Sequence, residues 1–309
     1  MRAVAVRAFR ADPEVIHVPK PEPGPGEVLV KIEYAALNPF DWQVAEGFFD
    51  GRVPHVFPLV LGVDFAGRVD VVGPGEHRFV VGDAVYGQAG RPPLGTGTFA
   101  EYVIMPQDAA IAGVPDGLAL RAAAALPTAG MTALQILRAG VALEPGDSLL
   151  VVGAAGGIGS ALTQLAAARD LRVVAAVRGD ERERMGALGA EFTVDTTEES
   201  VREACRRAFP GGLDAVVDLA SADPESFAAH AALLRPGGTA LSTRSAAPPG
   251  RGVNFQLRAD GALLEALADA AGAGQVHMPV EGEYPLEKAP EALARNRAGG
   301  ARGKTLFVP

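Results

Sequence analysis

A glycine-rich turn between two apolar runs constrains this chain more than any other feature. Residues 149–152 form an apolar run typical of a buried strand, and the alanine-rich residues 161–168 favour a helix. Glycines in such a turn let the backbone approach a pyrophosphate, and the first turn of the helix offers unpaired N–H groups to it. The pattern therefore predicts a dinucleotide site. The turn residues expected to contact the dinucleotide are Ala154, Gly156, Gly157, Ile158 and Gly159.

The end of the next apolar run distinguishes between two nicotinamide dinucleotides. Residues 172–177 predict a second strand, which Arg178 follows. NADH sites place an acidic residue near this point, whereas a guanidinium suits the 2′-phosphate of NADPH. We therefore predict NADPH, bound by Arg178 and Arg182. Two alternatives stay open: one of Arg182 and Arg184 is only a solvated helix charge, or Asp180 binds the ribose of NADH.

Composition argues against several other classes of protein. The 309 residues suffice for two packed domains, and a net charge of −9 does not favour nucleic acid or an anionic membrane as partner. Cys205 is the only cysteine, which excludes an intramolecular disulfide; it is expected to be a small helix residue. The sequence contains neither a signal-peptide pattern nor an apolar run of membrane-spanning length. We expect a cytoplasmic protein with a small-molecule substrate.

The texture of the sequence changes twice along the chain. Residues 1 to about 115 contain short strand-like runs separated by Gly and Pro, which suggests a barrel-like β domain. From 149 to about 245, strands alternate with helices, as in parallel βαβ units. The tail predicts a strand at 276–280, a helix at 285–297 and a strand at 305–308. We therefore expect a β domain over 1–118, a nucleotide-binding domain over 119–274, and a return to the first domain over 275–309, with the active site in a cleft.

A series of motifs spread over nearly the whole chain resembles the medium-chain dehydrogenase/reductase superfamily. The motifs are NPFDW at 38–42, LGVDFAG at 61–67, VGDAVYG at 81–87, ALPTAGMTA at 125–133, AAGGIG at 154–159, LGA at 188–190, RPGG at 235–238 and GK at 303–304. The most similar branch is the zinc-free, quinone oxidoreductase-like group. This resemblance implies an α/β protein with a GroES-like β-barrel domain and a Rossmann domain, whose parallel sheet is doubly wound.

The resemblance also allows the zinc ligands of the superfamily's alcohol dehydrogenases to be checked. Asn38 stands where those enzymes have the first cysteine, and Gly62-Val63-Asp64 stands in place of Gly-His-Glu. The later cysteines are missing, and the five histidines show no ligand spacing. We expect no metal.

Without zinc, the remaining chemistry is hydride transfer to an acceptor that is already electrophilic. Quinones and α,β-unsaturated carbonyls fit, because their reduction depends mainly on positioning beside the nicotinamide. We predict an NADPH-dependent reductase of such compounds. Two other readings stay open: a biosynthetic enoyl reductase or tailoring enzyme with a larger or carrier-bound substrate, and a non-catalytic NADPH-binding protein similar to zeta-crystallin.

The resemblance implies roles for several residues of the first domain. Asn38 is expected to hydrogen-bond the nicotinamide ribose or the substrate oxygen, and Thr128 to lie beside the nicotinamide. Asp41 is a candidate proton relay, although the alternative is a helix cap. Asp64 is expected to be a structural polar residue of the cleft wall.

The remaining candidates surround the cofactor and the acceptor. Phe48, Phe49 and Phe57 are expected to line the acceptor pocket, the alternative being core packing. Ser221, Ser242 and Arg244 follow predicted parallel strands at the end where ligands bind. Lys304 resembles a family position near the phosphates of the cofactor.

A homodimer is expected, because members of this branch commonly pair edge to edge through their nucleotide-binding domains. Residues 238–242, with the prolines at 248–249, are the candidate edge. An exposed edge strand in a soluble protein requires a cover, which a second copy supplies.

Overall fold

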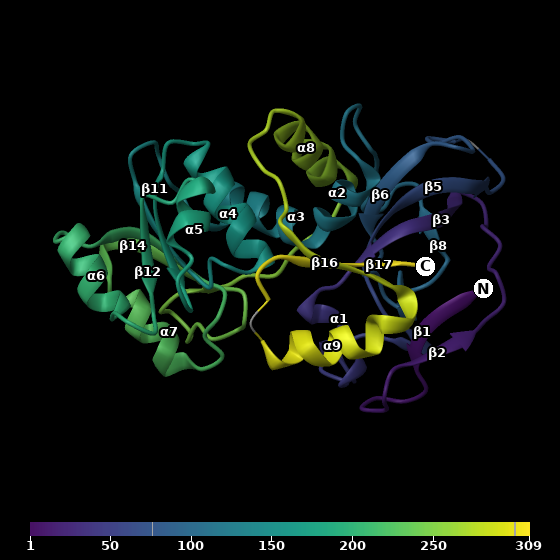
Figure 1. Ribbon diagram of the computed structural model, residues 1–309, viewed down its shortest axis with the longest axis horizontal. Coiled ribbons are helices and arrows are strands. Elements are labelled where there is room, and N and C mark those ends of the chain that lie inside the picture. The colour runs from purple at the N-terminus through teal and green to yellow at the C-terminus, as the bar shows by residue number, and fades with distance from the viewer. Residues whose placement is uncertain (76, 300) are drawn as a thin grey trace. The chain divides into compact units, whose positions relative to one another are not determined.

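The structure, a computed structural model, describes residues 1–75, 77–299 and 301–309 and divides into two units (Figure 1). Unit 1 comprises Met1–Thr128, Ala259–Ala273 and His277–Pro309. Unit 2 comprises Ala129–Arg258 and Gly274–Val276. The chain therefore leaves unit 1 for unit 2 and later returns.

Unit 2 is built on a parallel sheet of strand order β12-β11-β10-β13-β14-β15. Its strands are β10 (Ser148–Val152), β11 (Arg172–Val177), β12 (Phe192–Asp195), β13 (Leu213–Asp218), β14 (Leu234–Ser242) and β15 (Val253–Asn254). Its helices are α3 (Pro127–Gln135, beginning at the boundary of unit 1), the π-helical turn η1 (Ile136–Gly140), α4 (Gly157–Ala167), α5 (Arg182–Ala187), α6 (Val201–Ala208) and α7 (Pro224–Ala231). This strand order is that of the Rossmann fold, as the sequence predicts.

The glycine turn between β10 and α4 has the tight packing that its sequence implies. A Cβ atom added to Gly159 would lie 2.5 Å from both the Cα of Ala154 and the carbonyl oxygen of Gly153. Only glycine therefore allows α4 to pack so closely on the turn. Gly156 caps α4 without a side chain, so the N–H groups of the first helical turn have no side-chain acceptor there.

Unit 1 consists mainly of short strands in two sheets, of orders β2-β1-β4-β7 and β16-β17-β3-β5-β6-β9, with β8 also pairing with β3. Its strands are β1 (Arg2–Val6), β2 (Glu14–His17), β3 (Glu27–Ala36), β4 (His55–Val60), β5 (Asp64–Val72), β6 (Ala84–Gln88), β7 (Leu94–Thr96), β8 (Tyr102–Pro106), β9 (Ile111–Gly113), β16 (Val280–Pro285) and β17 (Lys304–Val308). Its helices are α1 (Pro39–Ala45), α2 (Leu120–Ala125), α8 (Gly261–Gly272), the 3₁₀ turn η2 (Leu286–Lys288) and α9 (Ala289–Ala298). A core that includes Phe65, Phe99 and Phe307 holds the sheets together.

The register of three neighbouring strands brings distant residues to one end of the larger sheet. Ala36, at the end of β3, is paired with Leu306 of β17 and with Asp64 at the start of β5. The C-terminal strand thus lies beside the segment that carries the first predicted site residue.

The domain boundaries differ from those expected from the sequence. Helices α2 and α8 belong to unit 1, whereas the sequence analysis placed both in the nucleotide-binding domain. Ala123, Ala124 and Ala125 of α2 are buried, and α8 is tied to β6 by a 2.6 Å hydrogen bond from the Tyr86 hydroxyl to the Leu264 carbonyl. Alanine-rich helices carry no sequence signal for which sheet they cover.

The strand expected at 276–280 is wrong, because β16 begins at Val280. Val276 and Met278 are buried in an irregular segment, and a buried loop has the same apolar character as a short strand. Pro279 has no N–H to offer to a ladder, although its carbonyl accepts a 2.7 Å hydrogen bond from the N–H of Lys304.

The predicted sheet edge is partly covered, because a short strand pairs with its last two residues, Leu241 and Ser242. Residues 238–242 lie in β14, and β15 pairs outside them through Val253 and Asn254. Two prolines and two glycines lie between β14 and β15, and they conceal the short strand in the sequence.

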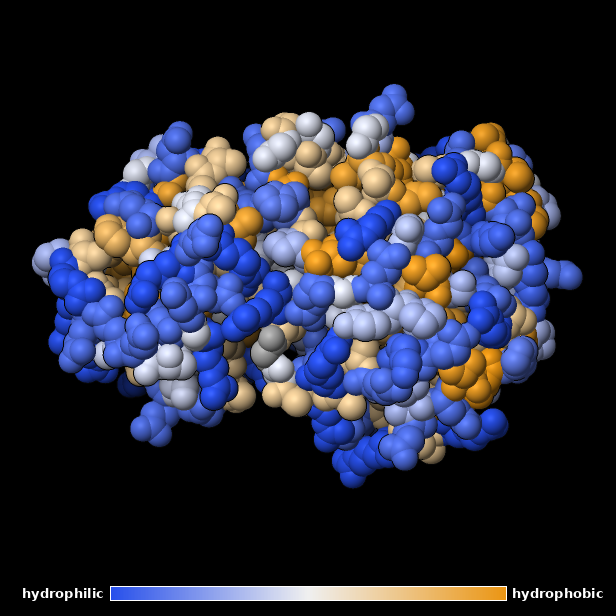
Figure 2. Space-filling view, viewed as in Figure 1, coloured by the Kyte–Doolittle hydropathy of each residue, from blue (hydrophilic) through white to orange (hydrophobic). Residues whose placement is uncertain are grey.

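The face of the molecule drawn in Figure 2 is mostly hydrophilic, with apolar side chains in separate small groups. Among the residues described, no helix has the length and apolar character needed to cross a bilayer. The cytoplasmic location expected from the sequence stays a prediction.

Candidate active site

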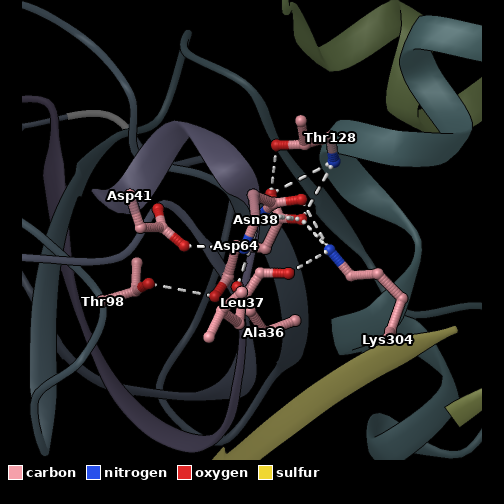
Figure 3. Close-up of polar contacts among 8 residues, drawn as sticks. All are labelled: Ala36, Leu37, Asn38, Asp41, Asp64, Thr98, Thr128 and Lys304. Atoms are coloured by element: carbon pink, nitrogen blue, oxygen red, sulfur yellow. Dashed lines mark hydrogen bonds and ion pairs between the residues drawn. The ribbon is translucent and has the colours of Figure 1, made fainter. Parts of the chain in front are cut away.

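A buried polar network joins four segments of unit 1 (Figure 3). Asn38 lies between β3 and α1, Asp64 begins β5, Thr128 lies in the first turn of α3, and Lys304 begins β17. Asn38, Asp64 and Lys304 are all buried, whereas Thr128 is partly exposed. Burying so many polar groups is unfavourable unless each is hydrogen-bonded, so the network must be nearly complete.

The ammonium of Lys304 lies at the centre of this network. Its side chain is only 3% exposed, and Nζ lies 2.6 Å from Oδ1 of Asn38, 3.0 Å from the carbonyl of Leu37 and 3.4 Å from Oδ2 of Asp64. Three acceptors account for the three hydrogens of an ammonium. Lys304 therefore binds groups inside unit 1. The contact with the cofactor phosphates that the resemblance implies stays a prediction.

The amide of Asn38 is engaged at both ends. Its Oδ1 accepts from Lys304, and its Nδ2 donates to Oδ2 of Asp64 at 2.9 Å and to the carbonyl of Ala36 at 3.4 Å. These contacts use both amide hydrogens on the protein itself. Asn38 thus holds Asp64 and Lys304 in place, and the direct ligand contact predicted for it stays a prediction.

Thr128 is the solvent-facing end of the network. Its hydroxyl donates to Oδ1 of Asp64 at 2.6 Å, and its backbone N–H lies 3.1 Å from the same oxygen. Because the hydroxyl hydrogen is used on the carboxylate, Thr128 acts toward a ligand only as an acceptor. Asp64, which was expected to be a structural residue of the cleft wall, thus makes the Thr128 hydroxyl an acceptor toward any ligand. Thr128 is the residue that was predicted to lie beside the nicotinamide.

Asp41 is a helix cap in this structure, which was the alternative to a proton relay. Its Oδ2 accepts a 2.7 Å hydrogen bond from the N–H of Asn38 at the start of α1. The side chain is almost completely buried, and its Oδ1 has no hydrogen-bond partner in the described parts of the chain. Burial, with a smaller contribution from the charge of Asp64, raises the pKa of Asp41 well above its usual range.

The predicted phenylalanine cluster separates into two groups. Phe48 and Phe49 lie 5.5 Å apart, and Phe49 packs on Phe40, while Phe57 contacts Phe9 instead. Phe48 and Phe57 are exposed, as a binding surface requires. A cavity of about 20 Å³, enough for about one water molecule, is lined by Phe40 and Asp41 among others.

In unit 2, the three predicted arginines have different surroundings. Arg178 is exposed and makes no side-chain hydrogen bond or ion pair with the described residues. Arg182 faces two acids, Asp180 at 3.8 Å and Glu198 at 3.2 Å, so its charge is partly offset. Asp180, the alternative ribose ligand, is therefore paired with a cation.

Arg184, one of the two arginines for which the alternative was a solvated helix charge, makes contacts that its sequence did not predict. Its Nη2 donates to the carbonyl of Ala155 in the glycine turn at 3.0 Å, and its Nε donates to the buried Glu181 at 2.7 Å. The spacing of three residues between Glu181 and Arg184 on one helix face was the available signal. Arg184 thus braces the turn rather than being a solvated charge.

The other polar candidates of unit 2 lie at the carboxyl ends of β13 and β14. The N–H of Ser221 donates to Oδ1 of the buried Asp218 at 2.8 Å. Ser242 is buried, and its hydroxyl accepts from the N–H groups of Arg244 and Ala246, so it stabilises the turn. The side chain of Arg244 is exposed.

Comparison with known proteins places these features among oxidoreductases. Residues 24–116 match the family described as "Alcohol dehydrogenase GroES-like domain", and residues 188–306 match the family described as "Zinc-binding dehydrogenase". A chloroplast envelope quinone oxidoreductase homolog of Arabidopsis thaliana is 31% identical, with 96% of this chain and 94% of that protein covered.

Solved structures also match the entire chain, and two of them serve as examples. An NAD-dependent alcohol dehydrogenase is 31% identical with a TM-score of 0.88, and all of its chain is covered. A mycobacterial protein solved in complex with NADPH is 27% identical with a TM-score of 0.84, again with both chains fully covered.

The name of the second family raises the question of whether this site fits zinc. Asn38 occupies the position of the first cysteine ligand and the apolar Val63 that of the histidine ligand, while Asn38 and the neighbouring Asp64 contact the Lys304 ammonium. Among the described residues, no group of three or more His, Cys, Asp or Glu side chains could hold a metal ion. The residues therefore do not fit the tetrahedral set of nitrogen and sulfur donors that zinc takes.

Replacement of Lys304 tests the network. Lys304→Met is expected to lower the free energy of unfolding by about 3–5 kcal/mol, because it leaves the Asp64 carboxylate buried without its cation. Lys288→Met, which removes an exposed pair with Glu291, should cost less than about 1 kcal/mol. Urea denaturation of both variants measures the difference, and equal losses would contradict the central role of Lys304.

Replacement of Asp41 tests the raised pKa of its buried carboxyl. The raised pKa means that the folded protein binds a proton that the unfolded chain releases, so this group lowers stability as the pH rises above about 4 toward its folded pKa. Asp41→Asn removes this dependence. Its melting temperature should match that of the parent at or below about pH 4 and exceed it increasingly as the pH rises from there, whereas the exposed Asp50→Asn should show a constant difference. A constant difference for Asp41→Asn would show that the carboxyl is ionised.

Proposed function

Because the chain belongs to the medium-chain dehydrogenase/reductase superfamily, in its quinone oxidoreductase-like branch, we propose that it is a zinc-independent reductase that transfers a hydride from NADPH to a quinone or an α,β-unsaturated carbonyl compound. The chain is thus an oxidoreductase with a nicotinamide cofactor. The observation that carries the proposal is the Lys304 ammonium, which is bound by Asp64 and by Asn38, the residue that stands in place of a zinc-ligand cysteine. A site built this way suits acceptors that need no Lewis acid.

The residues of unit 2 fit a nicotinamide dinucleotide. The turn before α4 has a glycine cap that leaves the first helical N–H groups without a side-chain acceptor, as a pyrophosphate site requires, and Gly159 lets α4 pack closely on the turn. Arg178 would bind the 2′-phosphate, since its guanidinium is exposed and unpaired among the described residues. When bound, NADPH supplies the hydride.

The residues of unit 1 would position the reacting groups. Thr128 presents an acceptor whose direction is set by its hydrogen bond to Asp64, and this suits an amide N–H of the nicotinamide. Asn38 would act indirectly by keeping Asp64 and Lys304 in place. Phe48 and Phe57 offer exposed aromatic surface to a flat acceptor.

Cofactor binding and turnover test this proposal together. The purified chain should oxidise NADPH in the presence of benzoquinones or simple enones, with no loss of rate in EDTA, and should bind NADPH at least about tenfold more tightly than NADH. Arg178→Asp should lose most of that preference, since an acid repels the 2′-phosphate. Arg202→Ala, which removes an exposed arginine of α6, is the matched control and should change neither affinity.

Two results would contradict the proposal. If no quinone or enone accelerates NADPH oxidation although NADPH binds, the protein is a binding protein rather than a reductase. If NADH and NADPH bind equally well, the assignment of Arg178 to the 2′-phosphate is wrong.

We also propose that two copies pair through the outer edge of the sheet in unit 2. Only Leu241 and Ser242 of β14 pair with β15, and Val253 of β15 is 48% exposed. Such an edge is a pairing surface. Light scattering at micromolar concentration should give twice the 31.8 kDa of one chain. Val253→Asp should shift the mass toward the monomer and the exposed Val80→Asp should not, whereas a monomeric parent would exclude the dimer.

A further inference from the structure

The backbone on both sides of Arg178 is held by the neighbouring strand β12. The N–H of Thr196 donates to the carbonyl of Val177 at 2.8 Å, just before Arg178. The N–H of Gly179, just after it, donates to Oδ1 of Asp195 at 2.9 Å. The parallel register of β11 and β12 places Val177 opposite Asp195, which explains how this side chain reaches the turn. Arg178 is thus fixed at its backbone while its guanidinium stays exposed.

Asp195 accepts the hydrogen bond that ties Gly179 to β12, which we call the tether. The residue is 4% exposed, and the same oxygen that accepts from Gly179 also accepts from the N–H of Thr197 at 2.9 Å and its hydroxyl at 2.7 Å. These donors, the Thr197 N–H foremost, lower the pKa of Asp195, so it is a carboxylate at neutral pH. Charge-assisted hydrogen bonds of this kind are stronger than neutral ones.

The tether matters for Arg178 because Gly179, the residue after it, is conformationally flexible. Its φ of +95° lies in the region that glycine adopts readily, and its flexibility would otherwise let the segment rearrange. A bound anion is recognised best by a donor whose position is set in advance, because binding then orders fewer groups. The carboxylate therefore restricts the one residue next to Arg178 that has the greatest conformational freedom.

We propose that Asp195 is a positioning residue that holds Arg178 in place for the 2′-phosphate and thereby sets the preference for NADPH over NADH. This inference rests on the proposed NADPH-dependent function. Asp195 acts only through the backbone of Gly179, so its loss should affect the cofactor that carries the 2′-phosphate and leave the other unchanged.

The test measures the ratio of the NADH and NADPH dissociation constants by fluorescence titration of the full chain. Asp195→Ala is expected to weaken NADPH binding at least about fivefold and to change NADH binding less than about twofold. Asp195→Asn keeps an oxygen for Gly179 and should retain most of the ratio. Thr197→Val removes another donor to Asp195 without touching the Gly179 contact, so it is the matched control and should leave the ratio unchanged.

A second variant keeps the test decisive if Asp195→Ala does not fold. Asp195→Ser can still bond the N–H of Thr197 two residues on, as serine does in such turns, but it is too short for Gly179. It should therefore fold and still lose the preference. In an Arg178→Ala background, neither substitution should change the ratio further, because a residue that acts through Arg178 has no effect without it.

The outcomes separate this inference from the proposed function. A parent protein that binds neither cofactor, or both equally, contradicts the proposed function. A parent that prefers NADPH, together with Asp195→Ala and Asp195→Ser variants that keep the full ratio, overturns the role of Asp195. Equal weakening of both cofactors would assign Asp195 a purely structural role and would also overturn it.

Discussion

A single buried ammonium organises the polar end of unit 1. A charge in a protein interior is tolerated only when counter-charge and hydrogen-bond acceptors surround it, and Lys304 obtains these from Leu37, Asn38 and Asp64. Satisfying that charge fixes the amide of Asn38, and the amide helps to fix the carboxylate of Asp64. Asp64 in turn determines which way the hydroxyl of Thr128 points. Thr128, the partly exposed side chain of this group, is therefore oriented through Asp64 by the buried charge of Lys304.

Unit 2 uses carboxylates in a similar way at the ends of its strands. Asp195, at the end of β12, holds the N–H groups of Gly179 and Thr197, and Asp218, at the end of β13, holds those of Ala220 and Ser221. The carboxyl ends of parallel strands are where ligands bind in such folds. Both acids bind the protein's own loops, and they shape the nucleotide end of the sheet, where Arg178, which follows β11, stays exposed.

The sequence alone predicted the architecture of unit 2 and the position of the glycine turn, because strand and helix periodicity are local properties. It assigned Asn38 and Lys304 to ligands, which stays a prediction, and it did not reveal the hydrogen bond that joins these two side chains across 266 residues of sequence. Nothing local to either residue indicates such a partner. The strand expected at 276–280 was wrong for a related reason, since burial makes a loop apolar without making it extended.

Two further contacts were not predicted, and they differ in how far a local sequence pattern indicates them. The pairing of Arg184 with Glu181 follows ordinary helix spacing, although its contact with Ala155 depends on the fold. The tether from Asp195 to Gly179 depends on the register of two strands, which a single sequence does not specify. Hydrogen bonds between residues far apart in the sequence depend on strand register and packing, which a local sequence pattern does not determine.

The place of Lys304 in the last strand has a consequence for how the chain matures during translation. The ribosome releases residues in order, and domains generally fold as units as they emerge. Unit 2 ends at Val276, so its sheet can form while the C-terminal strands are still being made. Asn38 and Asp64 are among the earlier residues to emerge, but their partner Lys304 lies in β17 and is synthesised near the end of the chain. The nascent protein can therefore hold a folded nucleotide unit before its other polar centre exists.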